Sequence, residues 1–178
     1  GKLTKLHAWM HVLYGAELLD GGKTDEARAA LENGVNMPKS YGEAKTFFNQ
    51  EAHIFYHLAK LYAKMGKSEQ ETEAYEQAAV YKAAVSELSL FRALALRELG
   101  RSDEAKAVLE EMISVADNLI VNKDLRTYYG VGSPSPMPFE YDIEKNNLRD
   151  GSILKAFALL GCDKTAEAEA CMATAREL

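Results

Sequence analysis

The peptide AKMGKSEQETEAY, residues 63–75, joins an apolar helical pattern to an alanine-rich one through a single glycine. Glycine readily adopts the left-handed conformation that ends an α-helix, and a serine, threonine or aspartate placed after it can cap the next helix. Small alanine side chains then let two helices approach closely. The peptide therefore predicts a helix-turn-helix with its turn at Gly66.

Three other peptides repeat this order of residue types, which makes it an internal repeat. They are LLDGGKTDEARAAL (18–31), RELGRSDEAKAVL (97–109) and LLGCDKTAEAEAC (159–171). The four turn glycines, Gly22, Gly66, Gly100 and Gly161, are separated by 44, 34 and 61 residues. The two longer intervals predict insertions at about 37–48 and 122–146.

Apolar residues recur at helical spacing along nearly the whole chain, and alternating strand patterns are almost absent. The pattern predicts helices at 3–20, 24–36, 46–65, 68–82, 84–99, 102–121, 145–160 and 163–176. These form four pairs, at about 3–36, 46–82, 84–121 and 145–176. Each pair must stack on a neighbour to bury its apolar face.

The repeat resembles the tetratricopeptide repeat, which has a small residue midway along its first helix, a glycine at the turn and small or aromatic residues in its second helix. The matching residues are Gly15, Gly22, Ala27 and Leu31; Leu58, Ala59, Tyr62, Gly66, Tyr75 and Ala78; Ala93, Gly100, Ala105 and Leu109; and Gly161 and Ala166. The resemblance implies an all-α fold, a right-handed superhelix of about four helix-turn-helix pairs with two insertions, forming one domain over 1–178.

Three longer stretches, 41–66, 94–112 and 124–161, also resemble the C-terminal repeat region of a group of bacterial proteins. In that group the region follows a mutarotase-like domain of unknown function that is associated with carbohydrate. Gly1 stands before Lys2 without an initiator Met, which favours a fragment of a longer chain. The resemblance implies an upstream domain but assigns no catalytic residue.

Composition narrows the classes of partner. The chain has 178 residues, of which 47% are hydrophobic, and 21 Lys and Arg against 27 Asp and Glu give a net charge of −6. No net positive field is available for nucleic acid or anionic lipid, and no run of eighteen apolar residues predicts a membrane span. The two cysteines suggest neither a disulfide framework nor a zinc site. We expect a cytoplasmic protein.

Two motifs that suggest ligands have simpler explanations. His7 with His11, and His53 with His57, each share a helical face, but neither pair has the glutamate of a zinc-peptidase motif. The peptide GGKT at 21–24 lacks the earlier glycine of a phosphate-binding loop and follows a helix instead of a strand. We therefore predict no metal, no cofactor and no catalytic residues.

The segment GVGSPSPMPFEYD, residues 130–142, carries three prolines at alternate positions, which exclude a helix. One interpretation is a ligand-contacting lid, and the favoured one is a fixed crossover whose aromatic residues fill a gap between repeats. The candidate contacts of this loop, 132–141 with its flank, are Tyr128, Tyr129, Phe139 and Tyr141.

In a tetratricopeptide register the first helix of each pair lines the concave face. The exposed positions there are predicted to be Trp9, His53, Tyr56, Lys60, Lys64 and Arg97. Aromatic and basic groups together suit a peptide carboxylate, an acidic segment or a sugar ring. The alternative is that Trp9 is covered by an upstream domain and that the basic residues are merely solvated.

Two hypotheses follow. The first is a non-catalytic repeat scaffold that mediates protein association, with its own upstream domain or a second copy as partner. The second is an accessory region that completes a carbohydrate-binding or glycoside-processing site of a larger bacterial enzyme. The first rests on the repeat and on the missing catalytic motifs, and the second on the bacterial resemblance alone.

Overall fold

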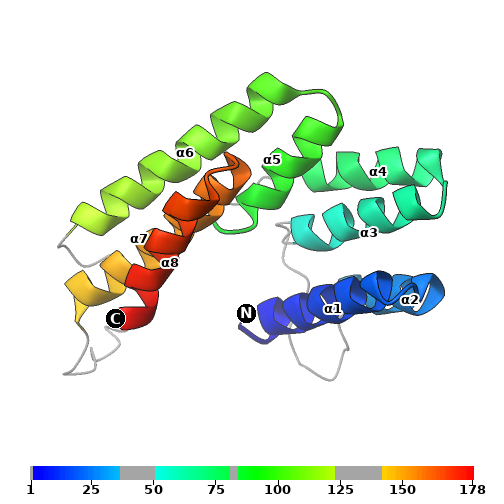
Figure 1. Ribbon diagram of the computed structural model, residues 1–178, viewed down its shortest axis with the longest axis horizontal. Coiled ribbons are helices and arrows are strands. Elements are labelled where there is room, and N and C mark those ends of the chain that lie inside the picture. The colour runs from blue at the N-terminus through cyan, green and yellow to red at the C-terminus, as the bar shows by residue number, and fades with distance from the viewer. Residues whose placement is uncertain (1, 37–50, 81–83, 123–141) are drawn as a thin grey trace, which may run out of the picture. The chain divides into compact units, whose positions relative to one another are not determined.

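The computed structural model describes residues 2–36, 51–80, 84–122 and 142–178, and within these ranges it contains eight α-helices and no strand (Figure 1). The helices are α1 (Lys2–Asp20), α2 (Thr24–Val35), α3 (Ala52–Lys64), α4 (Ser68–Ala79), α5 (Ser89–Glu98), α6 (Ser102–Val121), α7 (Ile143–Gly161) and α8 (Thr165–Glu177). The predicted all-α fold class is confirmed.

The chain divides into two compact units, residues 1–109 and 110–178. In the first unit α1 packs on α2 and α3 packs on α4, as Figure 1 shows for the second of these pairs. Helix α3 also contacts α1 and α2, and α5 contacts α3 and α4. The first helices of three successive pairs therefore lie next to one another in this unit. The prediction of one domain over 1–178 stays a prediction.

The turns inside the four pairs share one backbone geometry. Gly22, Gly66 and Gly100 have φ values of 76°, 69° and 75°. The residue after each glycine donates its N–H to a carbonyl five residues earlier, at 2.8–2.9 Å, as from Lys67 to Tyr62. This is the hydrogen bond of a glycine-terminated helix, so these three predicted turns are confirmed.

In the fourth pair the predicted turn glycine was wrong. Gly161 is the last residue of α7, and the left-handed residue is Asp163, with φ 61°. Lys164 then donates to the carbonyl of Leu159 at 2.9 Å, as its counterparts do in the other turns. Aspartate tolerates this conformation better than most residues with a side chain, because its short polar group bonds locally.

The expectation that serine, threonine or aspartate would cap the second helices was also wrong. For α2, α4 and α8 the N-cap residues are Lys23, Lys67 and Lys164, and none makes a side-chain capping bond. Two of these lysines instead approach a glutamate in the first turn, at 3.8 Å from Lys23 to Glu26 and 3.3 Å from Lys164 to Glu167. The hydroxyl residues Thr24, Ser68 and Thr165 are instead the first residues of these helices.

Helix α5 begins later than predicted, at Ser89 instead of residue 84. The Oγ of Ser86 accepts a hydrogen bond from the N–H of Leu88, and the Oγ of Ser89 accepts one from the N–H of Ser86. Serine side chains compete with the helical pattern for backbone groups in this way. The predicted helix start at residue 46 and the predicted helix end at residue 82 lie outside the described residues.

Close contact within the first unit depends on small residues. A Cβ on Gly15 of α1 would lie 2.7 Å from Cγ of Leu31 in α2. A Cβ on Gly34 of α2 would lie 2.9 Å from Cβ of His11 and 3.3 Å from Cδ1 of Ile54 in α3. Glycine at these two positions lets α2 pack directly on α1 and α3.

The second unit contains the end of α6 with α7 and α8. Helix α7 packs on α8 through Ala156, Leu159 and Ala168, with Cys171 and Met172 against them. A Cβ on Gly151 would lie 2.7 Å from Cγ1 of Ile120, so α7 also lies close to α6. Cys162 and Cys171 are free thiols.

Candidate functional site

An aromatic cluster joins α1, α3 and α5 in the first unit. We define it as Trp9, His53, Tyr56, His57 and Phe91. The ring of Trp9 lies 4.7 Å from that of His53 and 5.7 Å from that of Phe91, measured between centroids. Such separations are those of favourable aromatic pairs. The cluster fixes the three first helices against one another.

His53 lies inside this cluster, with 1% of its surface exposed. Neither of its ring nitrogens has a hydrogen-bond partner among the described residues. Burial, followed by the nearby charge of His57, lowers the pKa of His53 from 6.5 to about 3. The imidazole is therefore neutral near pH 7 and acts as a packing residue. The prediction that His53 is exposed for partner contact was wrong, because Trp9 and Phe91 lie over it.

His57 and Tyr56 form the partly exposed side of the cluster. Nδ1 of His57 lies 2.7 Å from the backbone oxygen of His53, which fixes the imidazole on its own helix. Burial lowers the pKa of His57, and the charge of Lys60 lowers it further while the bond to His53 raises it. Burial and the charge of Glu98 raise the pKa of Tyr56. Both rings are neutral near pH 7.

Charged residues lie along the helices that carry the cluster, and the charges of Lys60 and Arg97 act on His57 and Tyr56. Lys60 and Lys64 are exposed along α3, and Arg97 is exposed at the end of α5. Lys64 reaches Asp20 of α1 at 4.0 Å, and Lys5 of α1 reaches Glu87 at 3.9 Å. Exposed ion pairs of this length contribute little to stability. The face thus presents partly exposed aromatic rings together with exposed charged side chains of α3 and α5.

Of the six residues predicted for this face, Trp9 and Tyr56 are partly buried in the cluster and Lys60, Lys64 and Arg97 are exposed. His57 and Phe91 complete the cluster and are not among the predicted residues. A helical projection of α3 carried a signal for His57, since it follows His53 by four residues. No local signal marked Phe91, because its role depends on how α5 packs on α3.

The paired histidines form no metal centre within the described ranges, where no group of three or more His, Cys, Asp or Glu residues converges. His7 and His11 lie 4.5 Å apart between ring centroids, and Nε2 of His7 lies 3.1 Å from the backbone oxygen of Asn33. The peptide GGKT spans the turn between α1 and α2, so it follows a helix as predicted.

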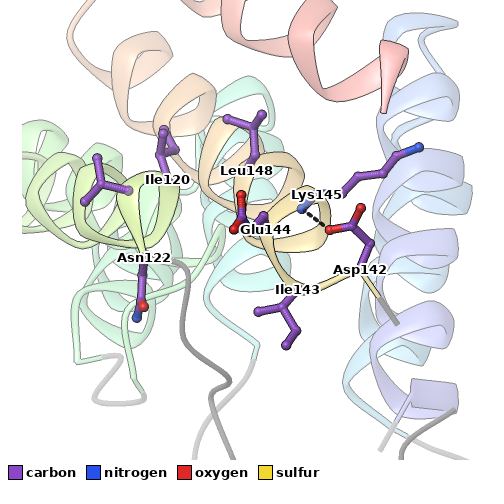
Figure 2. Close-up of a pocket in the computed structure, with 8 residues that line it drawn as sticks. Ile120, Asn122, Asp142, Ile143, Glu144, Lys145 and Leu148 are labelled. Carbon is purple, nitrogen blue, oxygen red and sulfur yellow. Dashed lines mark hydrogen bonds between the residues drawn. The ribbon is translucent and has the colours of Figure 1, made fainter. Parts of the chain in front are cut away.

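The second unit has a pocket of about 740 Å³ between the end of α6 and the start of α7 (Figure 2). Figure 2 shows Oδ1 of Asp142 accepting the N–H of Lys145, at 2.9 Å, which caps α7. Asn122 and Asp142, the residues on either side of the undescribed range 123–141, both line this pocket. The predicted loop contacts Tyr128, Tyr129, Phe139 and Tyr141 lie in that range, outside the described residues, so the pocket supports no binding site.

Residues 52–84 and 87–111 match models of the tetratricopeptide repeat. They correspond to the α3–α4 pair and to α5 with the first half of α6, so this chain carries tetratricopeptide repeats. Comparison with curated proteins and with solved structures gave no significant match. The narrower bacterial resemblance gains no support from these comparisons and stays a prediction.

Tetratricopeptide repeats generally mediate protein–protein interaction and are typically non-catalytic. None of the described helices is both long enough and apolar enough to cross a membrane. The described helices thus include tetratricopeptide repeats, and the first helices α1, α3 and α5 form one shared face.

Proposed function

We propose that the first unit is a non-catalytic scaffold that binds a carboxylate-bearing segment of a protein on the shared face of α1, α3 and α5. The observation that carries this proposal is the aromatic cluster, whose partly exposed rings lie beside exposed cations. A segment bound there would contact the edges of Trp9 and Tyr56 and place its carboxylates near Lys60.

Rigidity of the face supports binding. Trp9 packs on His53 and Phe91, and Tyr56 packs on Phe91 and on Tyr75 of α4, with ring centroids 5.8 and 5.9 Å apart. Aromatic side chains that are already ordered lose little conformational entropy when a partner binds. Aromatic residues of this kind often contribute most of the affinity in protein interfaces.

The charges favour an acidic partner. Lys60 is exposed and has no ion-pair partner among the residues described, whereas Lys64 shares its charge with Asp20. Lys60 follows Tyr56 by four residues and His57 by three on α3, so its side chain lies on the same side of the helix as these rings. Its charge also lowers the pKa of His57. An exposed cation beside an aromatic edge suits the carboxylate of an aspartate, a glutamate or a chain end.

The proposal also covers where the acidic segment comes from. An upstream domain of the same polypeptide or a second copy would satisfy the chemistry if it offered an acidic segment. The carbohydrate hypothesis has no observation in its favour, because neither the comparisons nor the described side chains point to a sugar.

A peptide-display experiment tests the proposal. Random dodecapeptides would be selected on the immobilised full chain, and the selected peptides measured by fluorescence anisotropy. We expect enrichment of Asp and Glu and a loss of affinity of about tenfold or more for the Lys60→Glu variant, which reverses one close charge. Lys106→Glu, an exposed change on α6, is the matched control.

Two results would contradict the proposal. One is selection of peptides without acidic residues. The other is selection of acidic peptides that bind the Lys60→Glu and Lys106→Glu variants equally well, which would place binding elsewhere or attribute it to net charge.

A further inference from the structure

Helix α1 exposes an apolar face that the aromatic cluster does not use. We define the outer face of α1 as Leu6, Met10, Leu13 and Tyr14, which are 60%, 60%, 63% and 55% exposed. Their spacing places them on one side of the helix. The other large exposed apolar residues of the described chain, Val80, Val121 and Leu160, occur singly on different helices. Single exposed apolar residues are ordinary, but four together mark an interaction surface.

The internal repeat allows positions of α1 to be compared with the equivalent positions of α3. The turn glycines Gly22 and Gly66 are 44 residues apart, and the same interval relates Gly15 of α1 to Ala59 of α3. It also relates Met10 to Ile54 and Tyr14 to Leu58. Ile54 and Leu58 are buried, with 0% and 5% exposed. Two positions that are covered in α3, those of Met10 and Tyr14, are thus uncovered in α1. A third, Leu13, corresponds to the partly exposed His57.

The preceding helix pair covers the α3 face. Helix α3 contacts both α1 and α2. The close approach occurs where Gly34 of α2 leaves room for Ile54, since a Cβ on that glycine would lie 3.3 Å from Cδ1 of Ile54. A helix pair with a small residue at this position is therefore the structure that buries this kind of face.

We infer that the outer face of α1 binds a helix pair of the tetratricopeptide type, stacked before α1 as the α1–α2 pair is stacked before α3. The occupant carries a small residue opposite Met10, in the place that Gly34 has opposite Ile54. Met10 and Tyr14 carry this inference, and neither belongs to the aromatic cluster proposed to bind the acidic segment.

The experiment extends the full chain by one helix pair. A copy of residues 2–45 is placed directly before Lys2, so that its turn glycine stands 44 residues before Gly22. We expect the original Met10→Glu substitution to leave the melting temperature of the unextended chain nearly unchanged and to lower that of the extended chain by about 5 °C or more. Val121→Glu, at an exposed apolar residue of α6, should have little effect in either chain.

Hydrogen exchange gives a second measure, since amides of the original α1 should become more protected in the extended chain. Equal effects of Met10→Glu in the two chains, with unchanged exchange in α1, would overturn the inference. So would sedimentation showing that the unextended chain forms a dimer that Met10→Glu abolishes, because a second copy would then cover this face.

Discussion

Trp9 and His53 hold the same position in successive repeats, 44 residues apart, and their rings contact each other at 4.7 Å between centroids. The contact joins the first helix of one pair to the first helix of the next. Because each ring belongs to a different pair, the stability of both pairs depends on it.

The first prediction concerns Trp9. Replacing it with alanine removes the ring that covers His53 and packs on Phe91, so we expect the free energy of unfolding to fall by about 2 kcal/mol, less than for a fully buried tryptophan. Urea unfolding followed by circular dichroism measures this. Tyr14→Ala, on the exposed side of α1, should change it by less than about 0.5 kcal/mol. Equal losses in the two variants would mean that the contact between Trp9 and His53 does not add to the free energy of unfolding.

The second prediction concerns acid. The folded chain keeps His53 neutral down to about pH 3, whereas the unfolded chain binds a proton there below about pH 6.5. The contribution of His53 to the free energy of unfolding is therefore fully present above pH 6.5 and is lost as the pH decreases toward 3. Burial lowers the pKa of His11 and His57 as well, which adds to the same trend.

The His53→Leu variant isolates the contribution of His53. Leucine has a similar size and no unpaired nitrogens, so stability at pH 7.5 should stay within about 1 kcal/mol of the parent. Between pH 6 and 4 the variant should lose less stability, by up to about 1.4 kcal/mol per pH unit. Melting temperatures at several pH values measure the slope, and parallel slopes in the two proteins would refute the assignment.

The third prediction uses the turns. Any side chain at Gly66 must adopt a φ of +69°, although a Cβ there would meet no atom within 4 Å. Gly66→Ala should therefore cost about 1 kcal/mol from backbone strain alone. Asp163 already bears this strain, so Asp163→Gly should raise the free energy of unfolding by about 0.5 kcal/mol. Urea unfolding of both variants tests the pair, and a destabilised Asp163→Gly protein would contradict the equivalence of the turns.

The fourth prediction concerns Gly15. In an isolated helix Gly→Ala would stabilise by about 1 kcal/mol, but here the new methyl would lie 2.7 Å from Cγ of the buried Leu31. Overpacking of this kind costs about 1–3 kcal/mol, so the clash should win and Gly15→Ala should destabilise. Adding Leu31→Val should recover part of the loss, and a double-mutant cycle measures the coupling. Strict additivity would show that α1 and α2 simply move apart.

Local chemistry made most of the helices predictable. Gly22, Gly66 and Gly100 end their helices through backbone geometry that only nearby residues determine, so a sequence motif identifies them. The fourth turn was misplaced because Gly161 and Asp163 are both acceptable to a local motif. The helical positions around them decide which residue takes the left-handed conformation.

The candidate site was less predictable. A helical register predicted one face for Trp9, Tyr56 and Lys60, and the structure places the first two in one cluster. The register could not show that His53 is buried, because its cover comes from Trp9 in the previous repeat and Phe91 in the next.

The sequence by itself determined the helix pairs, three of their four turns and the presence of the repeat, because helix periodicity and a left-handed glycine act over only a few residues. The tertiary structure alone decided which apolar positions are covered: Ile54 is buried by α2, and the equivalent Met10 is exposed. Both residues suit a core equally well. Burial is a property of the neighbouring helices and not of the residue, so packing had to distinguish the core of this protein from its interaction surfaces.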